Sequence, residues 1–127
     1  MAELTAAPVV WIVDADQWPR AALRAELIER GYDAVGFVTL ADALARLVAA
    51  AKTAPPRLLL VALDGQPVTA RQLSLCTREH VPVVFTGGAV ALAAPAVRRF
   101  PAAAVLPRPI AIGEICDAIA RLVPLTA

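Results

Sequence analysis

Val9-Val10-Trp11-Ile12-Val13 is the stretch that decides the fold, and an acid, Asp14, follows it immediately. The run is apolar throughout and too short to make a typical helix. A strand with one exposed face would alternate apolar and polar residues, whereas a parallel strand covered by helices on both faces does not. The stretch therefore predicts a buried parallel strand that ends in a carboxylate.

Further along the chain, more short apolar runs alternate with segments of helical periodicity. Strands are expected at Pro8–Val13, Asp33–Phe37, Arg57–Ala62, Val81–Phe85 and Ala102–Leu106. Helices are expected at Gln17–Arg30, Leu40–Ala51, Val68–Glu79, Ala89–Phe100 and Ala111–Val123. Strand–helix pairs joined by right-handed crossovers give a doubly wound α/β fold of three layers. With no repeat or linker evident, residues 1–127 are expected to form one domain.

Local signals support these boundaries. Asp16 is placed to cap the first helix, Pro19 lies in its first turn, and Gly31 follows its end. The fourth helix has the weakest pattern, because it is rich in alanine and carries Pro95 in its interior. A proline there removes a hydrogen bond and clashes with the preceding turn, so this helix is expected to be short, kinked or displaced.

Composition narrows the function classes. The chain is 59% hydrophobic and 18% charged, which excludes a disordered chain. Its net charge is +1 and its basic residues are scattered, whereas a nucleic-acid surface needs a basic stripe. No apolar run approaches the ~20 residues that span a bilayer, and no signal-peptide pattern begins the chain. Cys76 and Cys116 fit no metal or redox spacing, which favours a reducing cytoplasm. Together, the charge, the apolar runs and the cysteines predict a cytoplasmic protein without nucleic-acid or membrane partners.

The order of these elements, their loop lengths and several strand-end motifs resemble a receiver domain, the phosphoacceptor module of two-component response regulators. The resemblance covers about Val9 to Val123 and rests on the ends of the first, third, fourth and fifth strands. It implies a flavodoxin-like five-stranded parallel sheet of order 2-1-3-4-5. It also implies a pocket for Mg²⁺ and phosphate where the carboxyl ends of the strands meet.

The acids that the family uses in this pocket are largely missing. Receiver domains end the first strand in two adjacent acids, whereas here Asp14 is followed by Ala15, with Asp16 one place further on. The third strand should end in the phosphoacceptor aspartate, and Ala62 stands at that position. The resemblance therefore implies a receiver scaffold that has lost its phosphorylatable residue.

The ends of the fourth and fifth strands differ less from the pattern of receiver domains. Thr86 matches the Ser or Thr that ends the fourth strand of the family, and Arg108-Pro109 replaces its Lys-Pro pair. The position of the family's aromatic switch residue corresponds to Val105. Glycines follow Thr86, and their backbone amides could cradle an anion or simply form a tight turn.

The charges of the pocket residues predict whether the pocket holds a metal ion. Mg²⁺ is held by carboxylates in near-octahedral geometry, whereas Asp14 and Arg108 would roughly neutralise each other. The expected site is an Asp14–Arg108 pair, with Thr86 as a third member, that needs no metal or other cofactor. Asp16 and Asp64 are nearby acids. The favoured interpretation is that Asp64 only begins a turn; the alternative is that a register slip brings its carboxylate into the pocket.

These observations favour a phosphorylation-independent, non-enzymatic signalling module that acts through protein–protein interaction. Its partner surface is expected on the fourth helix, fifth strand and fifth helix, with the chain itself or another signalling protein as partner. Four residues represent that surface: Val90, Leu92, Val105 and Ile110. Two alternatives stay open. One is an unusual phospho-switch that uses Asp64 or Asp14, and the other is a small flavodoxin-like ligand-binding protein or enzyme.

Overall fold

The structure is a computed structural model and describes residues 6–49 and 55–125. Its centre is a parallel sheet of order β2-β1-β3-β4-β5. The strands are β1 (Val9–Val13), β2 (Asp33–Phe37), β3 (Leu58–Ala62), β4 (Val83–Gly87) and β5 (Ala104–Pro107). This order, with helices on both faces, confirms the predicted doubly wound, flavodoxin-like fold.

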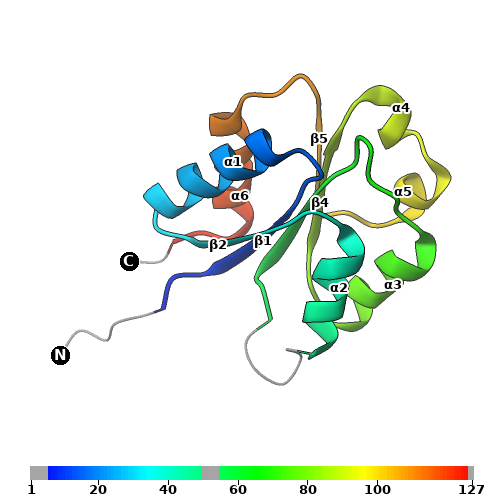
Figure 1. Cartoon of the computed structure of the whole chain (residues 1–127), viewed down its shortest axis with the longest axis horizontal. Coiled ribbons are helices and arrows are strands. Elements are labelled where there is room, and N and C mark those ends of the chain that lie inside the picture. Colours follow the sequence, from blue (N-terminus) through cyan, green and yellow to red (C-terminus); the bar gives the residue numbers. More distant parts are fainter. Residues whose placement is uncertain (1–5, 50–54, 126–127) are drawn as a thin grey trace.

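Helices cover the two faces of the sheet. They are α1 (Gln17–Glu29), α2 (Leu40–Ala49), α3 (Ala70–Arg78), α4 (Ala89–Leu92), α5 (Pro95–Arg99) and α6 (Ile112–Leu122). Figure 1 shows α1 and α6 together on one face, with α2 and α3 on the other. Because successive strand residues point to opposite faces, each strand supplies two cores. The first core, on the α2–α3 side, includes Trp11 and Phe85, and the second, on the α1–α6 side, includes Ile12 and Leu60.

The carboxyl ends of four strands meet at one edge of the sheet. Ala62 is paired in register with Thr86, and Thr86 with Leu106. Asp14 directly follows β1, and Arg108 directly follows β5. Asp14, Ala62 and Thr86 each lie two residues beyond a member of the second core, so their side chains face α1 and α6. The fold thus gathers the predicted pocket residues on one side of one edge.

β4 begins two residues later than predicted, because Val81 belongs to the end of the preceding helix. Its N–H donates to the carbonyl of Cys76 at 2.9 Å, and His80 before it has a left-handed φ of 59°. The strand also continues to Gly87, two residues beyond its predicted end at Phe85. Thr86 is therefore paired on both sides within the sheet.

The other boundary errors have similar local causes. Ala102 was expected in β5, but its N–H donates to the carbonyl of Phe100 at 2.9 Å, which turns the chain before the strand starts. The predicted fourth helix is two short helices, α4 and α5, because Pro95 begins a new helix and holds Ala94 out of helical geometry at ψ 135°. The predicted end of the second helix, Ala51, lies outside the described residues.

The two cysteines lie on opposite faces of the sheet. Cys76 belongs to the first core and Cys116 to the second, and both are free and buried. Burial raises the pKa of each thiol to about 11, so both are almost entirely protonated at neutral pH. The sheet between them excludes a disulfide within one chain.

Candidate functional site

Asp14 is anchored at the centre of the pocket by the backbone around it. Its own N–H donates to the carbonyl of Phe37 at 3.0 Å, which extends the β1–β2 pairing by one residue. The residue is only 7% exposed, and its Oδ1 accepts a hydrogen bond from the N–H of Asp16 at 2.9 Å. Its carbonyl accepts from Arg20 Nη1 at 2.7 Å, a contact with no signal in the sequence, because it depends on how α1 packs. The carboxylate is therefore fixed in place.

Arg108 divides its guanidinium between two carboxylates. Its Nη2 lies 3.6 Å from Asp14 Oδ2, which is an ion-pair contact longer than a hydrogen bond. Its Nη1 donates to Asp64 Oδ2 at 3.1 Å. The backbone of Arg108 is held too, because its N–H donates to the carbonyl of Gly87 at 2.9 Å. Asp14 and Arg108 do meet, but the shorter contact of Arg108 is with Asp64.

Asp64 does more than begin a turn, so the favoured interpretation of the sequence was wrong. The turn exists: the N–H of Gln66 donates to the carbonyl of Leu63 at 3.0 Å, and Gly65 takes a left-handed φ of 71°. In the same loop, the Asp64 carboxylate extends to Arg108. No register slip is needed, since β3 ends at Ala62 as predicted and the loop alone carries the carboxylate into the pocket.

A backbone amide holds the same carboxylate from the other side. The N–H of Gly88 lies 3.2 Å from Asp64 Oδ1 and 3.3 Å from Oδ2. Gly87 lets the loop approach, because a Cβ there would lie 3.2 Å from Leu63 Cβ. The glycines after Thr86 thus provide an anion-binding amide, and the anion that it binds is the chain's own aspartate.

Ala62 and Thr86 complete the wall without joining this network. Ala62 is 1% exposed and offers only a methyl group. Thr86 is also 1% exposed, and its Oγ1 has no hydrogen-bond partner among residues 6–49 and 55–125. The expectation that Thr86 is a third member of the Asp14–Arg108 pair is therefore wrong. A buried hydroxyl without a partner destabilises a fold by about 1–3 kcal/mol, so this group stands out.

Asp16 lies outside the pocket, because α1 uses its carboxylate. The side chain caps the helix by accepting from the N–H of Trp18 at 3.3 Å, as predicted. Ala15, at the family's second acidic position, is solvent-exposed. Asp14 is consequently the single carboxylate that β1 contributes to the pocket.

The residues present do not suit Mg²⁺. Among the described residues, no group of three or more His, Cys, Asp or Glu side chains is placed to hold a metal ion. The two carboxylates of the pocket, Asp14 and Asp64, already face one guanidinium, and Gly88 binds Asp64 as well. Mg²⁺ retains several waters and prefers carboxylates that are free to ligate it, so this donor set disfavours it.

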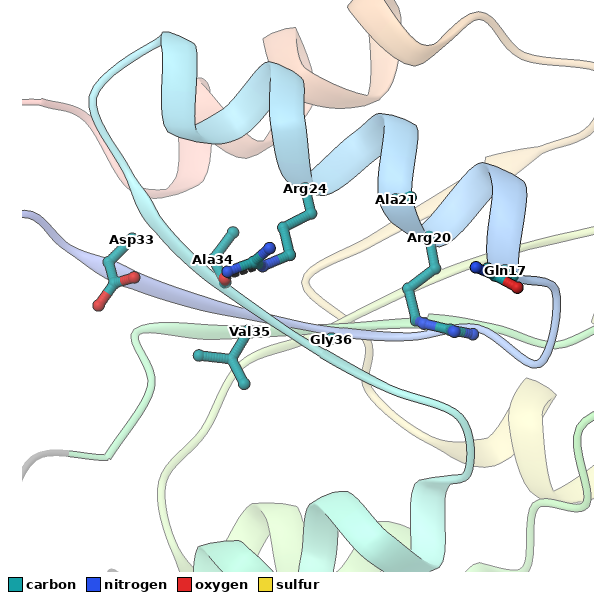
Figure 2. A pocket seen from close by; sticks show the side chains of 8 residues that line it. All are labelled: Gln17, Arg20, Ala21, Arg24, Asp33, Ala34, Val35 and Gly36. Carbon is teal, nitrogen blue, oxygen red and sulfur yellow. Dashed lines mark hydrogen bonds between the residues drawn. The ribbon is translucent and has the colours of Figure 1, made fainter.

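A hollow of about 430 Å³ lies away from the pocket of Asp14 and Arg108, between α1 and the edge strand β2. Figure 2 shows Arg20 and Arg24 reaching from α1 over the strand. Arg24 Nε donates to the carbonyl of Ala34 at 2.7 Å, and the stem of Arg20 lies over Gly36, where a Cβ would come within 3.1 Å of it. Charged side chains laid over an edge strand discourage pairing with other chains, so we assign this hollow a structural role.

The predicted partner surface is only partly exposed. Val90 on α4 is 90% exposed and Val105 on β5 is 50% exposed. Leu92, by contrast, packs against the first core, and Ile110 packs against the second. Val90 therefore lies outside both cores. Val90 and Val105 are the exposed apolar residues of this surface, and the other two support it from beneath.

Asp14 and Arg108 are expected to be energetically coupled. Asp14→Asn or Arg108→Met should each lower the free energy of unfolding by about 1–3 kcal/mol, because each leaves a partly buried charge without its partner. The double variant should lose less than the sum of the two. Asp64→Asn should cost less than about 1 kcal/mol, because that side chain is 44% exposed.

Urea unfolding of the single and double variants measures this coupling. Additive effects of Asp14→Asn and Arg108→Met would show that the 3.6 Å contact contributes nothing to stability. A larger loss for Asp64→Asn than for Asp14→Asn would show that the exposed contact, not the buried one, holds Arg108 in place.

Comparison with solved structures of other proteins supports the fold independently. No protein-family model and no curated protein matches the chain. Solved structures do match: a response regulator receiver protein from Pseudomonas putida has 22% identity and a TM-score of 0.74, with 93% of this chain and 99% of that chain covered. A receiver protein from Sinorhizobium medicae WSM419 has 16% identity and a TM-score of 0.73, covering 91% and 94%.

A response regulator receiver domain protein from Clostridium thermocellum gives 12% identity and a TM-score of 0.72, again covering 91% of this chain and 94% of that one. At identities this low, the likeness establishes the fold alone. The chain therefore has the fold of receiver domains over most of its length, and its function has to be argued from its own pocket.

Proposed function

We propose that this protein is a receiver-like signalling module that works without phosphorylation, through protein–protein interaction. One observation carries the proposal: the Asp64 carboxylate accepts hydrogen bonds from the Gly88 amide and from Arg108. It thereby occupies the two donors that would otherwise bind an incoming anion. Ala62 adds to it, because the residue at the end of β3 has no carboxylate to receive a phosphoryl group. The pocket is thus held in one state by its own charges.

Asp64 is also the best candidate for the alternative, an unusual phospho-switch. Its side chain is 44% exposed, so a phosphodonor can reach it. Against this, both of its oxygens are already hydrogen-bonded, and the residues around it do not favour Mg²⁺. Asp14, the other candidate, is 7% exposed and thereby shielded.

Intact-mass measurement decides between these functions. The protein is incubated with Mg²⁺ and acetyl phosphate, beside a receiver domain of known phosphorylation as positive control. We expect no phosphoryl adduct on this protein when the control is modified. An Mg²⁺-dependent adduct that Asp64→Asn removes would establish the phospho-switch and refute the proposal.

We further propose that Val90 and Val105 mark the partner surface, with a second copy of the chain as the simplest partner. Exposed apolar side chains on a short helix and an edge strand favour association. Val90→Asp is therefore expected to shift a dimer towards monomer in sedimentation velocity. Val48→Asp on α2 is the matched control, because Val48 is 55% exposed on a different element. A wild-type monomer at high concentration would refute self-association.

We also propose that the protein works in a reducing cytoplasm, and the state of its two cysteines agrees with this. Cys76 and Cys116 are free thiols in the two cores. Among the described residues, no helix is both long and apolar enough to traverse a bilayer.

A further inference from the structure

A cavity of about 190 Å³ extends from the pocket into the space between α1, α6 and the sheet. Three polar residues line it: Asp14, Thr86 and Arg108. The other lining residues are all apolar: Pro19, Leu23, Leu60, Ile110, Ile112 and Ile115. The cavity is therefore amphiphilic, with polar groups from the carboxyl ends of the strands and apolar groups from the second core and its surroundings.

Thr86 shows that the polar part of the cavity is incomplete. Its Oγ1 is buried and has no partner in the part of the chain that the structure describes. Buried hydroxyls are almost always hydrogen-bonded, to protein or to another molecule. Asp14 and Arg108 also line this cavity, in addition to forming their 3.6 Å contact with each other. The cavity thus offers one hydroxyl, one carboxylate and one guanidinium to an occupant.

We propose that this cavity binds a small neutral alcohol with a compact apolar body. A hydroxyl group both donates and accepts, so it can accept from Arg108 or Thr86 and donate to Asp14. The apolar body would contact the aliphatic side chains of α1 and α6, for example Leu23 and Ile115, which are 4% and 6% exposed. Apolar pockets with a few convergent polar groups are the usual form of small-molecule sites.

The charges of the pocket select a neutral head group. Two carboxylates, Asp14 and Asp64, already face the single guanidinium of Arg108. An anionic ligand would bring a third negative charge to that guanidinium, or would have to displace Asp14 from it. An alcohol adds no charge and leaves both ion pairs in place. Carboxylates and phosphates are therefore excluded in favour of alcohols and phenols.

The volume sets the size of the ligand. A cavity of about 150 Å³ lined by apolar side chains holds benzene, which has six carbon atoms. In proportion, a cavity of about 190 Å³ holds about eight non-hydrogen atoms. A phenol or cyclohexanol with one further methyl group has that size. Such small ligands have limited contact area, so dissociation constants in the high micromolar to millimolar range are expected.

Ile110 connects this cavity to the proposed partner surface. It lines the cavity and lies just beyond β5, where Val105 is exposed. A ligand that moves Ile110 would change the support of that surface. The inference goes beyond the proposed function and does not depend on it, because occupancy of the cavity can be measured whether or not the protein is phosphorylated or dimeric.

NMR titration of the ¹⁵N-labelled full chain tests the proposal with three probes: 4-methylphenol, toluene and benzoate. We expect saturable shifts for the amides of Thr86, Ile112 and Ile115 with 4-methylphenol. Toluene, which lacks the hydroxyl, should bind at least about fivefold more weakly, the effect of one hydrogen bond. Benzoate should give no saturable shift at these amides.

Ile112→Phe should abolish binding of 4-methylphenol by filling the cavity. Ile28→Phe is the matched control, because Ile28 is 46% exposed on α1 and does not line the cavity. Thr86→Val should reduce the preference for 4-methylphenol over toluene. The proposal is overturned if 4-methylphenol gives no saturable shift, which would mean that water alone occupies the cavity. Equal binding by the Ile112→Phe variant, or tighter binding of benzoate, would overturn it as well.

Discussion

Replacing Ala62 with aspartate is expected to destabilise the protein by about 3 kcal/mol near neutral pH. Ala62 is 1% exposed and lies beside Asp14, since Val61 is paired with Val13 in the preceding register position. A carboxylate at this position would be buried next to Asp14 and Asp64, and Arg108 already pairs with both of these. Desolvation and like charge both disfavour its ionised form.

The loss of stability should depend on pH in a defined direction. Burial and neighbouring carboxylates raise the pKa of the new carboxyl group in the folded state above its unfolded value of about 3.9. The variant is therefore close to wild-type stability at low pH, where the group is neutral in both states. The deficit grows as pH rises through the folded-state pKa. Ala62→Asn, of the same size without charge, should show no such pH dependence.

Mg²⁺ should partly rescue the Ala62→Asp variant. A third carboxylate facing one guanidinium raises the surplus negative charge of the pocket, which suits a divalent cation. Stabilisation on the order of 1 kcal/mol is expected at a Mg²⁺ concentration about tenfold above the dissociation constant. Wild type and Ala62→Asn should not respond. An Mg²⁺ response of the wild-type protein in urea unfolding would contradict our account of the pocket charges.

Gln66→Leu is the second substitution with a large expected effect, a loss of about 2–4 kcal/mol in the free energy of unfolding. Gln66 is 9% exposed, and its amide joins the pocket loop to the start of α2. Its Oε1 accepts from the N–H of Leu40 at 2.9 Å, and its Nε2 donates to the carbonyl of Val38 at 3.0 Å. Leucine fills similar space but leaves both backbone groups without this partner.

Gln72→Leu provides the matched control for that prediction. Gln72 also accepts from a backbone N–H, that of Thr69 at 3.0 Å, but in an exposed capping box at the start of α3. Water can replace this bond, so a loss of about 1 kcal/mol or less is expected. Equal losses for the two variants in urea unfolding would show that burial of the Gln66 amide is unimportant to the fold.

The sheet could be predicted from the sequence because its evidence is local. Runs such as Leu58-Leu59-Leu60-Val61 are apolar throughout, and the buried parallel strand that they predict is present. The predicted strand boundaries were wrong where an adjacent helix uses the same residue. Val81 is apolar enough for a strand, yet its N–H closes the end of α3 through the carbonyl of Cys76. Hydrophobicity alone does not distinguish these uses.

The pocket was predicted less completely, because side-chain contacts between loops depend on three-dimensional details. The strand ends gave Asp14, Ala62 and Arg108 correctly as neighbours. The role of Asp64 depends on a turn that Gly65 permits and on the close approach that Gly87 allows. Glycines in two loops that meet at the same edge were the available signal. The missing partner of the Thr86 hydroxyl has no sequence signal, because it depends on the side-chain rotamer and its surroundings.

Titration of the wild-type protein with Mg²⁺ and beryllofluoride, followed by NMR, is the most direct test of the central claim that the pocket's own aspartates occupy its anion-binding groups. Beryllofluoride imitates a phosphoryl group and would need the donors that now hold Asp64, the Gly88 amide and Arg108. We predict no saturable shift of the Gly88 amide or of Arg108 Nε at any ratio of the two reagents. A saturable, Mg²⁺-dependent shift of these signals would contradict the claim and show that the pocket still accepts a phosphoryl group.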